Sequence, residues 1–78
     1  MVHLVLYSRD GCHLCEDMIE HLNQLKEEYP FELEIRDVDS LVEWFNRYNE
    51  LVPVLESDGQ EICRYFLDQQ QLIELLKQ

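Results

Sequence analysis

The chain has 78 residues, 46% of them hydrophobic, which suits one packed domain, residues 1–78, and is too short for two. Its 17 acidic residues against 6 basic ones give a formal net charge of −11, which excludes the clustered Lys and Arg of a nucleic-acid-binding protein. No apolar run approaches the ~20 residues that cross a bilayer, and the first residues lack the basic segment of a signal peptide, so we expect a cytoplasmic protein that does not bind membranes.

Cysteine usage indicates a reducing compartment. The count of three is odd, whereas the disulfide scaffolds of secreted proteins normally carry an even number. Cys12 and Cys15 lie three positions apart, and Cys63 stands alone. This arrangement favours a working thiol pair over a structural framework. The acidic surface either favours basic protein partners or simply maintains solubility.

The first half of the chain predicts a strand, a helix and a second strand. Residues 2–7 form a short β-rich apolar run. Over residues 12–29 apolar side chains recur every three or four positions, which indicates an amphipathic helix that Pro30 ends. Residues 31–36 alternate apolar and charged side chains, as a half-buried strand does. Two strands joined in this way are expected to be parallel, with a right-handed crossover.

A second, short helix is predicted over residues 41–48. Ser40 and Glu43 have the spacing of a capping box, in which both side chains bond to free N–H groups of the first turn. Apolar residues at helical spacing then share one face, and we expect them in the core before we expect them in a binding surface: Leu41, Trp44, Phe45 and Tyr48.

The last third of the chain predicts a β-hairpin and a third helix. Residues 51–55 read as a strand that begins at a proline, and Asp58-Gly59 is a strong signal for a tight turn. The following strand, over residues 60–66, should therefore run antiparallel to it. Asp68 then has the position of a cap for a final apolar helix. The order β-α-β-α-β-β-α predicts an α/β fold with a four-stranded mixed sheet and three helices.

The stretch Cys12-His13-Leu14-Cys15 carries the clearest chemistry. It lies where the first strand leads into the first helix, and the free N–H groups and the positive end of the helix dipole there favour a thiolate. Cys12, at the mouth of the helix, is predicted to attack a disulfide, and Cys15 to resolve the mixed disulfide. A protonated His13 would stabilise the thiolate, although Glu16 and its acidic neighbour oppose it.

Zinc binding is the alternative interpretation of this pair. A structural zinc site needs about four ligands, commonly a second pair of Cys or His. The chain adds only Cys63 and three isolated histidines. We therefore predict no resident metal and no cofactor. The alternative that stays open is a non-catalytic binding module of the same fold that holds a metal through Cys12 and Cys15.

Two stretches form a recognisable combination: YSRDGCHLC at residues 7–15 and Val52-Pro53 before the third strand. The combination resembles the glutaredoxin-like branch of the thioredoxin superfamily, over essentially the whole chain. The resemblance implies thiol–disulfide oxidoreductase activity through the cysteine pair. It also implies a cis Pro53 against that pair, with the Val52 backbone binding an extended substrate segment, although Pro53 could simply open the strand. Arg9 matches a basic position of the family, where it would meet a substrate carboxylate or remain a solvated loop residue.

Departures from the family bear on the substrate. His13-Leu14 replaces the usual Pro-Tyr between the cysteines, and Cys63-Arg64 replaces a Gly-Gly pair. The acid that should follow this pair is out of register, with Asp68 its nearest equivalent. The Gly-Gly pair and the acid help hold glutathione in the family. We therefore expect a monomer that handles glutathione poorly and a protein disulfide better, with Arg64 facing solvent and Cys63 in the core rather than acting as an auxiliary thiol.

Overall fold

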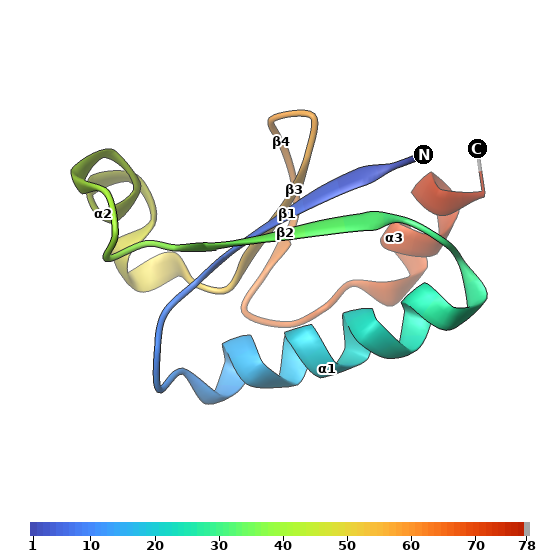
Figure 1. The fold of residues 1–78 in the computed structure, drawn as a ribbon, viewed down its shortest axis with the longest axis horizontal. Helices are drawn as coiled ribbons and strands as arrows, with labels where there is room; N and C mark the ends of the chain where they lie inside the picture. The colour runs from blue at the N-terminus through green and yellow to red at the C-terminus, as the bar shows by residue number, and fades with distance from the viewer. Residues whose placement is uncertain (78) are drawn as a thin grey trace.

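The computed structural model describes residues 1–77 and follows the predicted order of strands and helices, with one 3-10 turn added before the third strand (Figure 1). The elements are β1 (His3–Ser8), α1 (His13–Glu28), β2 (Glu32–Asp37), α2 (Val42–Tyr48), η1 (Asn49–Leu51), β3 (Val54–Ser57), β4 (Gln60–Arg64) and α3 (Gln69–Leu76). None of these helices is long and apolar enough to cross a membrane.

The four strands form one mixed sheet in the order β2-β1-β3-β4. β1 runs parallel to β2, and Leu6 of β1 lies opposite Ile35 there and opposite Leu55 of the antiparallel β3. β4 is antiparallel to β3. The predicted α/β class with a four-stranded mixed sheet and three helices is therefore confirmed.

The larger core lies on the sheet face that α1 and α3 cover. Leu4 and Leu6 of β1 are fully buried there with Leu55 of β3, and they meet Leu22 of α1 and Leu72 of α3. Burying a leucine side chain fully contributes roughly 1.5–3 kcal/mol, so this cluster contributes much of what holds the two helices to the sheet.

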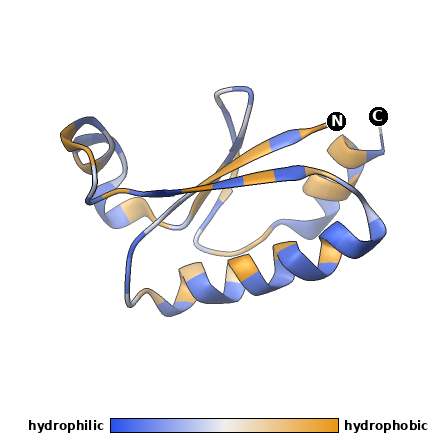
Figure 2. Cartoon of the chain, viewed as in Figure 1, coloured by the Kyte–Doolittle hydropathy of each residue, from blue (hydrophilic) through white to orange (hydrophobic). Residues whose placement is uncertain are grey.

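Helix α1 packs against the sheet through one apolar stripe. Met18, Leu22 and Leu25 are buried at steps of four and three, and hydrophilic residues occupy most of the remaining helix, as the alternating colours along α1 show (Figure 2). The helix ends at Glu28, and Tyr29 is already extended, as expected for the residue before Pro30.

A second, aromatic core lies on the other face of the sheet, under α2. The rings of Tyr7 and Tyr48 stack with centroids 3.9 Å apart, and Trp44 meets Tyr7 edge-on. The Tyr48 hydroxyl donates a 2.6 Å hydrogen bond to the buried carboxylate of Glu56. Burial, and then this carboxylate, raise the pKa of Tyr48 well above its ordinary value.

The predicted capping box at the start of α2 is wrong. Ser40 donates its hydroxyl to the Asp37 carbonyl at 2.6 Å, and the Asp37 carboxylate accepts the Asp39 N–H, so these side chains close a turn after β2 instead. Leu41 takes the N-cap position without a side-chain hydrogen bond.

Only part of the apolar face of α2 is buried in the core. Tyr48 is buried and Trp44 is half-buried, as expected. Leu41 and Phe45 are exposed, because they lie beyond the edge of the aromatic cluster.

Two strand ends differ from the prediction. Pairing in β3 begins at Val54 rather than residue 51, because η1 occupies residues 49–51 and proline has no N–H for the ladder. β4 stops at Arg64 rather than residue 66, because Tyr65 turns out of the strand with a φ of +66°. The predicted cap of α3 is confirmed, since the Asp68 carboxylate accepts the Gln71 N–H at 3.1 Å.

Candidate functional site

The two predicted segments of the site lie at the same end of the sheet. β1 leads into the cysteine loop, and β3 begins just after Val52-Pro53. Because the two strands are antiparallel neighbours with Tyr7 opposite Val54, the cysteine loop after β1 and the proline loop before β3 lie at the same end of these strands. The fold therefore brings together segments about forty residues apart in the sequence.

Cys12 is the N-cap of α1. Gly11, at a φ of +76°, turns the chain so that Cys12 arrives in an extended conformation. Its sulfur then accepts the backbone N–H of Cys15 at 3.2 Å, and its carbonyl accepts the Glu16 N–H at 3.0 Å. The sulfur thus lies against the free N–H groups and the positive end of the helix dipole, where a thiolate is a better acceptor than a thiol.

Cys15 lies in a different environment one turn further along. It is 2% exposed, whereas Cys12 is only half-buried. Burial, and then the hydrogen bond to the Cys12 sulfur, raise the pKa of the Cys15 thiol to about 12, although the Arg9 backbone acts in the opposite direction. At neutral pH Cys15 is therefore a protonated thiol. The two sulfurs, both free in this structure, are chemically unlike.

The Val52–Pro53 peptide bond is cis, as the family resemblance implied. Pro53 is buried, and its carbonyl accepts the Tyr65 N–H at 2.8 Å. Val52 is half-buried in an extended conformation, with φ −67° and ψ 147°. An extended residue of this kind has the backbone shape that pairs with an added strand.

Arg9 is tied into the protein. Its Nε and Nη2 donate to the Asp39 carboxylate at 3.0 and 3.1 Å, and Nη2 also donates to the Asn49 side-chain oxygen at 2.9 Å. The guanidinium lies 5.7 Å from the centre of the Phe45 ring. Arg9 is therefore not a freely solvated side chain, because it links the cysteine loop to the turn after β2 and to the end of α2.

His13 and Arg64 both face solvent. The His13 side chain is 96% exposed, and its Nδ1 lies 3.9 Å from a Glu16 carboxylate oxygen. Arg64 pairs with Glu61 through two hydrogen bonds of 2.7 and 2.8 Å, and its predicted solvent-facing orientation is confirmed.

Cys63 belongs to the edge of the larger core. It is half-buried on β4 opposite Leu55 and packs against the core cluster. Burial raises the pKa of its thiol above the ordinary value. These features agree with the predicted packing role.

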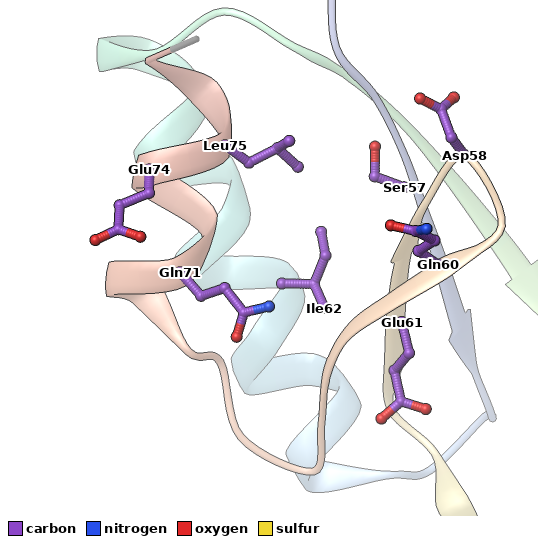
Figure 3. A pocket seen from close by; sticks show the side chains of 8 residues that line it. All are labelled: Ser57, Asp58, Gln60, Glu61, Ile62, Gln71, Glu74 and Leu75. Atoms are coloured by element: carbon purple, nitrogen blue, oxygen red, sulfur yellow. The ribbon is translucent and has the colours of Figure 1, made fainter.

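Three hollows help to define where ligands could bind. One lies under the cysteine loop and is lined by Arg9, Gly11 and Cys15 among others. A second lies between α1 and the segment after β4, and includes Leu14 and Tyr65. The third, between the β3–β4 hairpin and α3, is lined by Ser57, Asp58, Gln60, Glu61, Ile62, Gln71, Glu74 and Leu75 and contains none of the predicted site residues (Figure 3).

The sequence alone missed the segment after β4. Two consecutive aromatic residues that end a strand are a weak signal for an exposed turn, and nothing in the sequence marks Tyr65 for a positive φ.

A metal centre at the cysteine pair gains no support from geometry, since within residues 1–77 no three His, Cys, Asp or Glu side chains converge.

Comparisons with solved structures agree with this architecture. The NMR structure of protein Ne2328 from Nitrosomonas europaea is 41% identical over 95% of this chain and 89% of its own, with a TM-score of 0.85. The X-ray structure of protein XcR50 from X. campestris is 32% identical over 95% of both chains, with a TM-score of 0.68. Thioredoxin O1 from Arabidopsis thaliana, 18% identical over 99% of this chain and 76% of its own, shares the fold with a TM-score of 0.67.

No curated protein matches the chain. The family model described as "Glutaredoxin-like domain (DUF836)" matches residues 3–77. This match spans both segments of the candidate site and all seven helices and strands of the described structure. The chain therefore belongs to the glutaredoxin-like family (DUF836) and has the thioredoxin-type fold.

Proposed function

We propose that the protein is a thiol–disulfide oxidoreductase in which Cys12 is the nucleophile and Cys15 the resolving thiol. The observation that carries the proposal is the asymmetry of the pair. The Cys12 sulfur accepts an N–H bond at the start of α1, whereas Cys15 is buried and protonated. The Cys12 sulfur is thus arranged to attack a disulfide, whereas Cys15 stays protonated until the mixed disulfide has formed.

The first step forms a mixed disulfide. The Cys12 thiolate attacks one sulfur of the substrate disulfide, the substrate S–S bond breaks, and the departing half leaves as a thiolate. The N–H groups of the first turn favour the attacking anion before the bond forms.

The second step releases the substrate. Part of the raised pKa of Cys15 comes from its hydrogen bond to Cys12 and from the like charge there. Once Cys12 is bonded to the substrate its anion is gone, so Cys15 gives up its proton, to the departing thiolate or to water, more readily. It then attacks the Cys12 sulfur, and the second substrate half leaves. The pair has lost two electrons to the substrate, and an external thiol reductant must restore it.

A protein disulfide suits this site better than glutathione. The two arginines at positions where the family resemblance implies glutathione contacts are already paired, Arg9 with Asp39 and Arg64 with Glu61. The net charge of −11 adds a long-range repulsion for an anionic tripeptide at low salt. The extended backbone of Val52, at the same end of the sheet as the pair, supports strand-like binding of a polypeptide.

Reversible oxidation tests the function directly. In a Cys63→Ser background, a mild disulfide oxidant should remove two titratable thiols and a reductant should restore both, with the bond mapped to Cys12–Cys15. Reduction of a protein disulfide should exceed glutathione-dependent reduction of a small mixed disulfide. A protein whose thiols oxidise only irreversibly, or that reduces neither substrate, would not be an oxidoreductase.

A further inference from the structure

One side-chain hydrogen bond joins the cysteine loop (residues 9–12) to the proline loop (residues 49–53). Nη2 of Arg9 donates to the Asn49 side-chain oxygen at 2.9 Å in a part-buried contact. Within residues 1–77, no other side-chain hydrogen bond connects these two loops. The bond can form because α2, which ends at Asn49, and the start of α1 lie at the same end of the molecule (Figure 1).

Arg9 ties this contact to Cys12 through its own backbone. The Arg9 carbonyl accepts the Cys12 N–H at 3.3 Å. The guanidinium is also fixed by the Asp39 carboxylate, and it lies 5.7 Å from the centre of the Phe45 ring. A guanidinium held in this way presents Nη2 from one position. The proline loop is therefore fixed relative to Cys12 for as long as Asn49 accepts this bond.

Asn49 in turn determines where the Val52 backbone lies. Asn49 is half-buried at the C-cap of α2, and its N–H donates to the Phe45 carbonyl. The turn η1 begins at Asn49, and Val52 comes directly after this turn in an extended conformation. Because only two residues separate Asn49 from Val52, a shift of Asn49 moves the Val52 backbone with it.

We propose that Asn49 is a positioning residue for polypeptide substrates, and that its bond to Arg9 holds the Val52 backbone at the correct distance from the Cys12 sulfur. A polypeptide that pairs with Val52 is then held with its disulfide in reach of Cys12. Asn49 acts through Arg9 and needs no contact with the substrate. For its reaction and its substrate class the inference rests on the proposed oxidoreductase function.

The proposal predicts a difference between two kinds of substrate. A protein disulfide depends on the Val52 backbone, whereas a small disulfide without peptide groups needs Cys12 alone. Asn49→Ala should slow single-turnover reduction of a protein disulfide by about tenfold, because a small misplacement of reacting groups is costly. Reduction of a small disulfide, and alkylation of Cys12 by iodoacetamide, should slow by no more than about twofold, because the thiolate itself is unchanged.

Conservative replacement separates positioning from a general structural role. Asn49→Asp keeps an oxygen that accepts the Arg9 N–H, so it should stay within about twofold of the wild type on both substrates. Asn49→Ser, whose shorter side chain withdraws that oxygen, should repeat the loss and is the second variant if Asn49→Ala folds poorly. The matched control is Asn46→Ala, which removes the same kind of side chain from an exposed position of α2 and should behave like the wild type.

Hydrogen exchange measures the proline loop without any reaction. Exchange at the Val52 amide should accelerate by about threefold or more in Asn49→Ala, because the loop has lost its bond to Arg9. Arg9→Lys, which removes the same bond from the other loop, should accelerate this exchange as well. Asn46→Ala should leave it unchanged.

Three results would overturn the assignment of Asn49: equal losses for the protein disulfide and the small disulfide, an Asn49→Asp variant as slow as Asn49→Ala, or wild-type exchange at Val52 in both Asn49→Ala and Arg9→Lys. Failure of the proposed function has a different signature. If the wild type reduces neither substrate while exchange at Val52 responds as predicted, the oxidoreductase function fails, whereas the coupling of the two loops through Asn49 stands.

Discussion

Arg9 holds Asp39 in a two-pronged contact, with Nε and Nη2 donating to the two carboxylate oxygens at 3.0 and 3.1 Å. The contact joins the loop that ends at Cys12 to the turn after β2. A guanidinium fits this geometry because N–H groups on two of its nitrogens form a planar fork, whereas the N–H groups of an ammonium diverge from a single nitrogen and do not match the two carboxylate oxygens. Arg9 is thus placed to fix the conformation of the cysteine loop.

Replacing Arg9 with lysine should loosen that loop. Arg9→Lys keeps the charge but loses the fork and the bond to Asn49, and because the contact is partly solvent-exposed we expect only about 1 kcal/mol of lost stability. Hydrogen exchange at Gly11 and Cys12 should accelerate. Arg64→Lys, which disrupts an equally two-pronged contact with Glu61, should leave exchange at Cys12 unchanged. Equal exchange in Arg9→Lys and the wild type would show that the fork does not order the loop.

Cys15 should make the protein less stable at alkaline pH. Burial raises its pKa to about 12 in the folded state from 9.0, so above pH 9 the unfolded chain loses this proton while the folded chain keeps it. Folding then becomes less favourable as pH rises, by up to about 1.4 kcal/mol per pH unit from this group.

The measurement is urea unfolding between pH 8 and about 10.5, compared with Cys15→Ala, because other groups such as Tyr48 also contribute to the alkaline loss. The wild type should lose stability more steeply than the variant. Parallel curves would mean that Cys15 titrates normally in the folded protein.

Removing only the donor of the Tyr48–Glu56 hydrogen bond should lower the stability of the protein. Tyr48→Phe leaves the buried carboxylate of Glu56 without its donor, and we expect a loss of about 1–3 kcal/mol in urea unfolding. Adding Glu56→Gln should recover part of the loss, because a neutral amide is cheaper to bury than a carboxylate. A double variant less stable than Tyr48→Phe would contradict this account.

The redox midpoint should lie between the thioredoxin and glutaredoxin values, at about −200 to −270 mV. A value below about −300 mV would instead indicate a structural disulfide. Because the His13 side chain is 96% exposed, its charge is well screened, and His13→Gln should move the midpoint by less than about 20 mV. Equilibration with glutathione buffers measures both. A larger shift would give His13 a stronger influence on the Cys12 thiolate than its exposure allows.

Local pattern was enough to predict the fold. The apolar stripe of α1, the turn at Asp58-Gly59 and the cap at Asp68 depend on residues close in sequence, and the structure confirms them. The capping box failed because Ser40 bonds instead to the carbonyl of Asp37, three residues earlier. The Ser40 hydroxyl had two possible partners close in sequence, the first turn of α2 and the Asp37 carbonyl, and residue spacing alone does not show which of them it bonds.

From the residue pattern alone, the site was predictable only where the chemistry is local, and the cis Val52–Pro53 bond was predicted from the family resemblance instead. Cys12 and Cys15 share one helical turn, so their spacing already suggests a pair. Arg9 meets Asp39 and Asn49, which lie 30 and 40 positions away, and no periodicity encodes such contacts. The conformation of Tyr65 likewise depends on its hydrogen bond to the Pro53 carbonyl, a group that the pairing of β3 with β4 brings near.

Trapping of the mixed disulfide tests the central claim, that Cys12 attacks and Cys15 resolves. In a Cys63→Ser background, Cys15→Ser is mixed with a protein disulfide substrate, and the adduct is isolated without reductant and its bond mapped by mass spectrometry. We predict a stable mixed disulfide through Cys12, and no adduct from the reverse variant, Cys12→Ser, because the buried and protonated Cys15 cannot attack. An adduct through Cys15 in Cys12→Ser, with none through Cys12 in Cys15→Ser, would contradict the account.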